Sequence, residues 1–392
     1  MTINWSGKSF DYTDEELAVL VEVARTADPM TQGKYLEQFE KDFSTYLGVK
    51  YCFAVANATN ALDIAALLCG LKQDDEVIIP AHTFCASAYP FGRTGAKIVW
   101  ADIDPDTRLI SCESIEKLIT NKTKVIVAVH LYGLMADMNA IMEIAKKRDI
   151  FVVEDCAQSI GAELDGKKAG TFGDCGIFSF HGQKSLTTLG EGGVIVVKSD
   201  ELASKVPGLR HHGARPFPSG REHYWIPAMG NIDIDLDGVW PINTCLGEPQ
   251  CALGSAVLKR LDTMNEKRIA RARHFKEELK DFPELTFQIV KSGFKHVYHL
   301  LAAKYEGKNG RNNHDLIKTL FYEYNIKVIV QYYPLYRYPL FQKMGFGIAN
   351  CPNTDKYYDN MVSFPFHIWM SNEEFDYMIA CTKKALTKLR EE

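Results

Sequence analysis

The sequence lacks the features that mark secreted, membrane-spanning and nucleic-acid-binding proteins. Its ten cysteines are scattered over 392 residues without a Cys-x-x-Cys pair, so we expect reduced thiols in the cytoplasm and neither a metal site nor a disulfide framework. No apolar run is long enough to span a bilayer, and the first residues lack a signal-peptide pattern. A net charge of −5 without a basic cluster argues against nucleic-acid binding.

Repeats and nucleotide-binding turns are also missing. The chain has no internal repeat and no low-complexity tract, and no Gly-x-Gly-x-x-Gly turn follows its early strands, which argues against a dinucleotide oxidoreductase. Its composition, 46% hydrophobic and 24% charged, is that of an ordinary globular protein. The length suggests two or three domains with an ample core.

From about residue 50 to residue 200, short apolar runs alternate with helix-like segments. The candidate strands are CFAVAN, DEVIIP, AKIVWADI, KVIVAVH, IFVVED, GIFSF and GGVIVV. Most are continuous apolar runs, which is typical of strands covered on both faces in a mostly parallel sheet. Because segments such as SIEKLIT and MNAIMEIAKKR lie between them, we expect an α/β domain with helices on both faces of the sheet.

The pattern changes in the second half of the chain. Residues 214–244 are rich in Pro, Gly and aromatic residues without a clear period, and such long irregular stretches are usually functional. Residues 250–282 read as one long amphipathic helix or two in succession. The segments HVYHLLAAKY and IKVIVQYY flank a helical HDLIKTLFYEY and indicate a smaller α+β domain. We therefore predict a large domain over residues 1–245 and a small one over residues 246–392.

Two residues of the large domain carry groups suited to covalent chemistry. Lys184 lies in a turn among small and hydroxylated residues, where an amine can form a Schiff base with an aldehyde. Asp155 ends the run IFVVED, so its carboxylate can keep a pyridine nitrogen protonated at the carboxyl end of the strand. Taken singly, an exposed loop lysine and a helix-capping aspartate are the commoner interpretations.

A phosphate seat and a stacking ring complete the set. Ala58, Thr59 and Asn60 lie between a strand and a helix, where backbone N–H groups and the helix dipole suit a phosphate. Ser179 can add a hydroxyl donor. Phe84 follows the strand DEVIIP and can stack on a cofactor ring, although core packing explains an aromatic there equally well. Together with the acid and the amine, these residues indicate a site for an aromatic aldehyde phosphate.

Longer stretches resemble a known family. The segments VHLYGLMADM, LRHHG and, most specifically, VEDCAQSIGAELDGKKAGTFGDCGIFSFHGQKSLTTLGEGG are similar to the DegT/DnrJ/EryC1/StrS sugar aminotransferases. The resemblance covers nearly the whole chain. It implies the aspartate aminotransferase fold, pyridoxal 5′-phosphate as cofactor, and a homodimer with shared active sites.

The resemblance also implies roles for single residues. Lys184 matches the Schiff-base lysine, Asp155 the partner of the pyridine nitrogen, and Gln158 the residue near the ring hydroxyl. His181 matches a residue close to the substrate and joins Lys184 and Asp155 as a catalytic candidate. Because some relatives carry histidine in place of the lysine and perform a dehydration, Lys184 favours transamination. The other implied cofactor contacts are Ala58, Thr59, Asn60, Phe84 and Ser179, with Asn243 reaching the cofactor phosphate of the partner subunit.

Departures from the family pattern leave the sugar open. Cys245 and Pro249 replace an arginine and a helix residue of many relatives, and Gln331 and Tyr336 replace histidines. Nucleotide-activated keto-hexoses are the commonest substrates of such relatives. An oxidised 3-deoxy-octulosonic acid, aminated to 8-amino-3,8-dideoxy-octulosonate for lipopolysaccharide, is the alternative.

We expect an amino group to move from an amino acid, with L-glutamate as the donor, to a keto or aldehyde sugar for surface polysaccharide or lipopolysaccharide biosynthesis. Three arginines, Arg215, Arg221 and Arg337, can bind a carboxylate or phosphate, although surface charge is the commoner use of each. A regulatory protein that binds the cofactor without turnover is the alternative of another class. The candidate substrate contacts are His181, Arg215, Arg221, Gln331 and Arg337.

Overall fold

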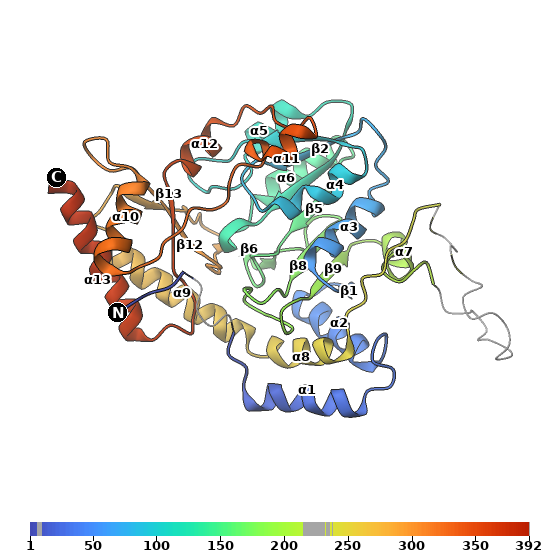
Figure 1. The fold of residues 1–392 in the computed structure, drawn as a ribbon. Helices are drawn as coiled ribbons and strands as arrows, with labels where there is room; N and C mark the ends of the chain where they lie inside the picture. The colour runs from blue at the N-terminus through green and yellow to red at the C-terminus, as the bar shows by residue number, and fades with distance from the viewer. Residues whose placement is uncertain (6–9, 215–231, 233–235, 237, 392) are drawn as a thin grey trace.

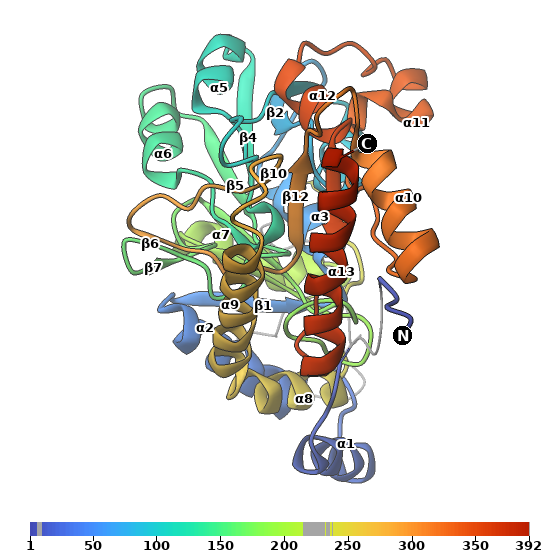
Figure 2. The same cartoon turned by 90° about the vertical axis from the view of Figure 1, so that its left-hand side faces the viewer.

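The computed structural model describes residues 1–5, 10–214, 232, 236 and 238–391. A seven-stranded sheet surrounded by helices forms the larger part of the molecule, and a smaller assembly that contains α10, α13, β12 and β13 lies at one end of it (Figure 1). The turned view in Figure 2 shows α5 and α6 together beside the large sheet, with α13 and α9 toward the viewer. None of the helices within the described ranges combines the length and apolarity needed to cross a bilayer.

The large sheet confirms all seven strands expected from the apolar runs, each within two residues of its predicted bounds. Strand β9 runs antiparallel to both of its neighbours, and the remaining pairs are parallel. This is the mostly parallel α/β sheet that the sequence predicts. In spatial order the strands are β1 (Tyr51–Val55), β9 (Gly193–Val197), β8 (Cys175–Ser179), β5 (Phe151–Asp155), β4 (Thr123–Val129), β2 (Glu76–Pro80) and β3 (Lys97–Ala101).

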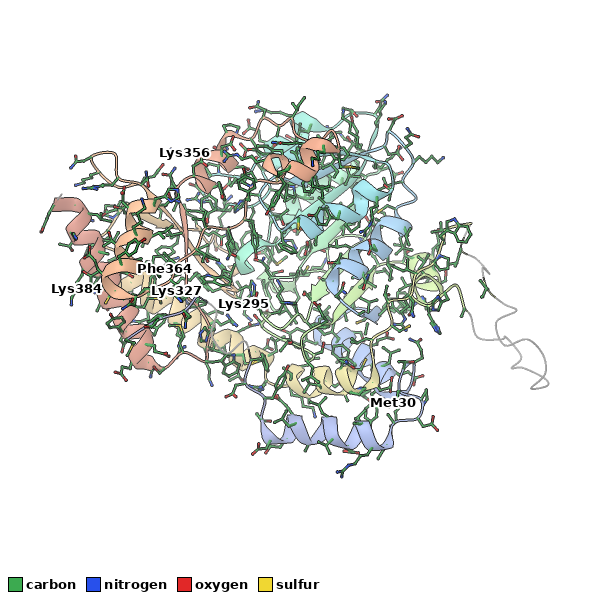
Figure 3. The ribbon with its side chains drawn as sticks, viewed as in Figure 1. Met30, Lys295, Lys327, Lys356, Phe364 and Lys384 are labelled. Atoms are coloured by element: carbon green, nitrogen blue, oxygen red, sulfur yellow. The ribbon has the colours of Figure 1, made fainter. Side chains whose placement is uncertain are left out.

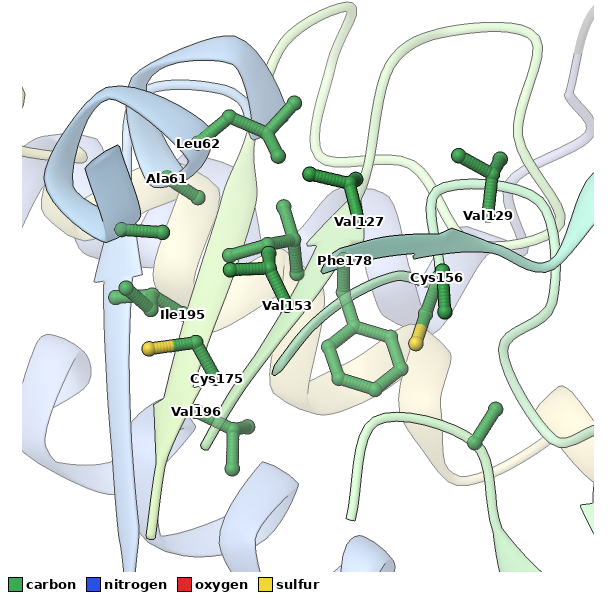
Figure 4. Close-up of a cluster of buried hydrophobic side chains, with 14 of the residues drawn as sticks. Ala61, Leu62, Val127, Val129, Val153, Cys156, Cys175, Phe178, Ile195 and Val196 are labelled. Atoms are coloured by element: carbon green, nitrogen blue, oxygen red, sulfur yellow. The ribbon is translucent and has the colours of Figure 1, made fainter. Parts of the chain in front are cut away.

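Apolar side chains from neighbouring strands form the core of this sheet. Val127 of β4, Val153 of β5 and Phe178 of β8 are fully buried, and Figure 4 shows them beside side chains of β9 and α3 (Ala58–Leu68). Burial of each apolar side chain of this kind contributes about 1.5–3 kcal/mol to the free energy of folding. The continuous apolar runs therefore fix the order of the strands. The strand ends that carry polar residues are thereby fixed in space.

Helices connect the strands and cover the sheet. Helix α3 packs against β8 and β9, and α6 packs against β5. Helices α5 and α6 confirm the helical segments expected between the strands, with ends that differ by two residues at most from the sequence pattern. The helices of this part are α1 (Asp14–Thr26), α2 (Lys34–Leu47), α3, α4 (Tyr89–Arg93), α5 (Cys112–Leu118), α6 (Met138–Lys146) and α7 (Asp200–Arg210).

The C-terminal part contains a second sheet, in which β12 lies between β10 and β13. Residues 250–282 form two helices in succession, which was one of the two expected arrangements. The segment IKVIVQYY, part of the predicted α+β domain, forms no strand: within the described residues it makes only isolated bridges, from Ile326 to Ile3 and from Ile329 to Ser363. Strand β13, which pairs with β12, was not predicted.

Six helices and the three strands of this sheet have their bounds in the described C-terminal residues. The helices are α8 (Glu248–Leu258), α9 (Leu261–Glu278), α10 (Asn313–Tyr324), α11 (Pro339–Lys343), α12 (Pro352–Tyr358) and α13 (Asn372–Glu391). The strands are β10 (Leu285–Phe287), β12 (Leu301–Tyr305) and β13 (Met361–Phe364). A third small sheet joins the two parts through β6 (Glu163–Leu164), β7 (Lys167–Lys168) and β11 (Phe294–Lys295), and short 3-10 turns occupy Cys85–Ser87, Leu131–Gly133 and Leu335–Arg337.

Buried side chains fall into two hydrophobic clusters. The first contains the large sheet together with Cys251 and Leu253 of α8, and the second contains the inner faces of α9, α10 and α13. Ile3 belongs to the second cluster although it lies at the N-terminus. The division after residue 245 stays a prediction. The packing shows that Ile3 belongs to the second core and that Cys251 and Leu253, which follow residue 245, belong to the first.

Candidate active site

A cavity of about 820 Å³ lies where the carboxyl ends of the large sheet meet the C-terminal part of the chain. Its walls include the last residues of β4, β5 and β8, the first turn of α3, and side chains from α9 and β13. Most of the sequence-predicted residues line this one cavity. They are Ala58, Thr59, Asn60, Phe84, Asp155, Gln158, Ser179, His181, Lys184 and Gln331.

Asp155 is the buried acid of the cavity. It is the last residue of β5, is 5% exposed, and accepts a hydrogen bond from Ser87 Oγ at 2.7 Å on one carboxylate oxygen. The other oxygen accepts the N–H of Ala157 at 3.1 Å. Thr83 Oγ1 lies 3.0 Å from Ser87 Oγ and continues the network. The carboxylate is therefore held in one orientation by the Ser87 hydroxyl and the Ala157 N–H.

Lys184 is the amine of the cavity. It follows β8 in a tight turn, in which its N–H donates to the carbonyl oxygen of His181 at 2.8 Å. Burial lowers the pKa of the Lys184 amine to about 8, against the opposing charges of Asp155 and Glu191. By contrast, the lysines labelled in Figure 3 on α12 and α13, Lys356 and Lys384, are exposed to solvent.

This lowered pKa predicts how fast the cofactor-free protein captures an aldehyde at different pH. The neutral amine is the nucleophile, and with a pKa of about 8 about a tenth of Lys184 is neutral at pH 7, against roughly 0.04% of an ordinary lysine. The rate of pyridoxal 5′-phosphate attachment, followed by absorbance, should therefore rise about tenfold from pH 7 to pH 9 and then level off. The control is Nα-acetyl-lysine, for which the rate of attachment should continue to rise beyond pH 10. The same behaviour in the protein would contradict the lowered pKa.

The first turn of α3 forms an anion seat beside Ser179. The helix makes its first backbone bond from the Ala61 N–H to Asn57, so the N–H groups ahead of it have no partner within the helix. The Asn57 side chain accepts the Asn60 N–H at 2.9 Å. A Cβ on Gly193 of β9 would lie 2.5 Å from the backbone carbon of Asn57, so only glycine lets the helix start this close to the sheet. The remaining N–H groups and the helix dipole suit a phosphate.

Aromatic rings line another wall. Phe84 is 53% exposed, so core packing does not account for it, and its ring centroid lies 5.9 Å from that of Tyr332. Gln158 donates from Nε2 to the Tyr332 hydroxyl at 2.9 Å, and its Oε1 accepts the Tyr132 N–H at 2.8 Å. Sequence reasoning missed Tyr332, although the aromatic pair in IKVIVQYY was its signal. Tyr332 reaches the cavity from a segment far along the chain.

Sequence reasoning also missed Arg268 and His299. Both line the cavity and are buried, with 5% and 6% of their surface exposed. The signal for Arg268 is a charge on the buried face of an amphipathic helix, where Met264 and Ala272, one turn to either side, are core residues. His299 carries no comparable signal in the sequence.

Two other predicted contacts, Arg337 and Asn243, do not line the cavity. Arg337 pairs with Asp355 and with Asp359, so the structure gives its guanidinium another task, and the prediction that it meets the substrate is not retained. Asn243 makes an isolated bridge with His211 outside the cavity. The predictions for Arg215 and Arg221 lie outside the described residues.

One buried group of potential metal ligands contains His130, Glu154 and Cys156, whose donor atoms lie within 4.8 Å of one another. The Glu154 carboxylate accepts the His130 Nε2–H and three backbone N–H groups of the turn 170–173. His130 Nδ1 accepts the Ala136 N–H. Burial raises the pKa of the Cys156 thiol well above its usual range. These hydrogen bonds satisfy His130 and Glu154, so we interpret the cluster as part of the core around β5.

Comparisons with known proteins agree with this geometry. A family model described as the DegT/DnrJ/EryC1/StrS aminotransferase family matches residues 11–383. The spore coat polysaccharide biosynthesis protein SpsC of Bacillus subtilis is 33% identical over 356 residues, 90% of each chain. PseC of Helicobacter pylori, an aminotransferase involved in the biosynthesis of pseudoaminic acid, superposes with a TM-score of 0.88 at 26% identity over 99% of this chain and 100% of that one. Spr1654 of Streptococcus pneumoniae in its PLP form gives 0.86 at 25% identity over 99% and 100%.

Proposed function

Because the chain belongs to the DegT/DnrJ/EryC1/StrS aminotransferase family and is a pyridoxal-5′-phosphate-dependent sugar aminotransferase, we propose that it transfers the amino group of L-glutamate to a keto or aldehyde sugar destined for a surface polysaccharide. One observation carries the proposal: a buried carboxylate, a lysine of lowered pKa and a helix N-terminus face one cavity. The printed roles of SpsC and PseC in polysaccharide and amino-sugar biosynthesis support the choice of acceptor.

The residues of the cavity fit the cofactor. When bound, pyridoxal 5′-phosphate supplies an aldehyde and a pyridine ring that withdraws electrons from the reacting carbon. The first turn of α3 and Ser179 would bind the phosphate, and the fixed carboxylate of Asp155 would hold the proton of the ring nitrogen. Gln158 and Phe84 would position the ring, the first through its amide and the second by stacking.

Lys184 and His181 would act on the substrates. The Lys184 Nζ would take the proton from the donor carbon and pass it to the cofactor carbon within the same half-reaction. In the second half it would move a proton in the opposite direction, to the sugar carbon. Its lowered pKa makes the amine a base near neutral pH. His181, which lines the cavity three residues before Lys184, would contact the substrate as a further catalytic group, and Gln331 would contact the sugar.

A homodimer with shared active sites is part of the proposal. Asn243 lies outside the cavity of its own chain, as expected of a residue that reaches the cofactor phosphate of the partner subunit. Trp240, three residues earlier, is 88% exposed, and an aromatic side chain with that much surface is common at interfaces. Sedimentation velocity should give about twice the 44.2 kDa of one chain, and a monomer would contradict this part.

The proposed donor is tested on the purified holoenzyme. The protein should be yellow, and addition of L-glutamate should bleach or shift its visible absorbance and release 2-oxoglutarate. The aminated enzyme is then offered a GDP-linked 4-keto-hexose and an oxidised 3-deoxy-octulosonic acid, with mass spectrometry of the products. Absorbance that glutamate and other amino acids leave unchanged would contradict the proposal and indicate a regulatory protein that binds the cofactor without turnover.

A further inference from the structure

One wall of the cavity carries a group of buried nitrogen atoms without partners. Within the part of the chain that the structure describes, Trp5 Nε1, His299 Nδ1, His367 Nδ1 and two guanidinium nitrogens of Arg268 have no hydrogen-bond partner. All four side chains line the same cavity. Because buried polar groups in proteins are almost always hydrogen bonded, such a concentration of orphaned nitrogens indicates a missing acceptor.

Arg268 is the strongest of these groups. It projects from α9, and across the described ranges no carboxylate pairs with it. Burial and the neighbouring charge of Arg271 lower its pKa to about 10, which still leaves the guanidinium charged at neutral pH. An unpaired buried charge is costly, so its presence in a folded chain calls for a compensating anion.

The surroundings place this charge near the reacting amine. Burial lowers the pKa of His299 well below its usual range, and the nearby charges of Lys184 and Arg268 add to the effect. His299 is therefore a neutral ring that shares the cavity with two cations and can offer an N–H to an anion. Among the described residues, three acids line the cavity. Asp155 accepts from Ser87, Asp63 pairs with Arg93, and the charge of Glu191 acts on Lys184.

We propose that Arg268, assisted by His299, binds the carboxylate of the amino-acid donor. This inference rests on the proposed aminotransferase function and names the group that recognises the first substrate. The planar guanidinium matches a carboxylate in a two-point contact. The cofactor phosphate has its own seat at α3, so it does not explain the orphaned nitrogens on α9. The donor must place its amine next to Lys184, and His299 lies near both Lys184 and Arg268.

Two variants of the holoenzyme test the proposal without relying on turnover. Glutarate, a dicarboxylate without an amine, is titrated into the wild type, Arg268→Gln and Arg268→Lys by calorimetry. Arg268→Gln should bind it at least ~30-fold more weakly, because a neutral amide cannot compensate the charge. Arg268→Lys should lose about tenfold, since an ammonium cannot make the two-point contact. The exposed Arg273 of the same helix gives the matched control, Arg273→Gln, which should bind like the wild type.

Thermal unfolding separates recognition from a structural role. Removal of an uncompensated buried charge should leave the Tm of Arg268→Gln equal or higher, with unchanged cofactor content. A Tm several degrees lower in both Arg268 variants would assign the residue to the fold and overturn the proposal. Unchanged glutarate binding would overturn it as well.

The two half-reactions identify the source of the carboxylate. In Arg268→Gln, L-glutamate should shift the absorbance only at concentrations at least ~30-fold higher, whereas the aminated variant should react with a GDP-linked 4-keto-hexose at close to the wild-type rate. A loss confined to the sugar would assign Arg268 to the acceptor and overturn the proposal. If the wild type binds glutarate but does not react with any amino acid, the aminotransferase proposal fails while the carboxylate site stands.

Discussion

Lys184→Ala is expected to abolish amino transfer, with kcat reduced by at least ~10,000-fold. The variant loses both the amine that captures the aldehyde and the base that moves the donor proton. Asp155 and the anion seat at α3 are untouched, so the protein should still bind pyridoxal 5′-phosphate, although without a covalent bond. Turnover is measured as 2-oxoglutarate released from L-glutamate, and binding by dialysis.

Borohydride reduction provides the direct assay of the bond. Reduction of the wild type should fix the cofactor onto the peptide that contains Lys184, and reduction of Lys184→Ala should fix none. Lys198, exposed just beyond β9, gives the matched control, because Lys198→Ala removes an ordinary surface amine from a neighbouring position. Normal activity in Lys184→Ala, or labelling of another lysine in the wild type, would refute the assignment.

Asp155→Asn is expected to lower kcat by about 1,000-fold or more, roughly 4 kcal/mol of activation free energy. A neutral amide has the size of the carboxylate but cannot hold the proton on the ring nitrogen, so the ring withdraws electrons less effectively. Because Lys184 is unchanged, the variant should still be yellow and still be labelled on reduction with borohydride. This combination of an intact covalent bond and lost turnover is specific to the ring-nitrogen role.

A graded control comes from the hydrogen bond that orients this carboxylate. Ser87→Ala removes the 2.7 Å donor to Asp155 but leaves the charge in place, so its loss should be at most about tenfold. A loss below tenfold in Asp155→Asn itself would count against the proposed role. Equal losses in the two variants would show that orientation, and not charge, is what the ring requires.

The large sheet could be predicted from the sequence because its strands are local signals. Most of the apolar runs are buried on both faces, so the hydrophobic pattern alone marks them, and Asp155 and Ser179 stand out as polar ends of such runs. The same pattern failed for IKVIVQYY, whose residues make isolated bridges at Ile326 and Ile329 instead of a strand. An apolar run indicates only that its residues are buried. The apolar residues of IKVIVQYY pack between the two hydrophobic clusters and not within a sheet.

The part of the site that depends on long-range contacts could not be predicted. Arg268, His299 and Tyr332 reach the cavity from segments that are separated in the chain from β5 and β8, and their spacing in the sequence shows no motif. Arg337 was selected for its charge, but Asp355 and Asp359 neutralise it within the fold. Whether an arginine is paired is a property of the tertiary structure.

The close contact between Gly193 and the start of α3 has a further consequence for the spacing of the cofactor's two attachment points. The turn that carries Lys184 is the connection between β8 and β9, and Gly193 begins β9 against Asn57. One continuous piece of backbone therefore sets the separation between the amine and the phosphate seat. An inserted or deleted residue in this hairpin would shift both attachment points at once. The length of the hairpin therefore restricts the site to ligands with one distance between aldehyde and phosphate.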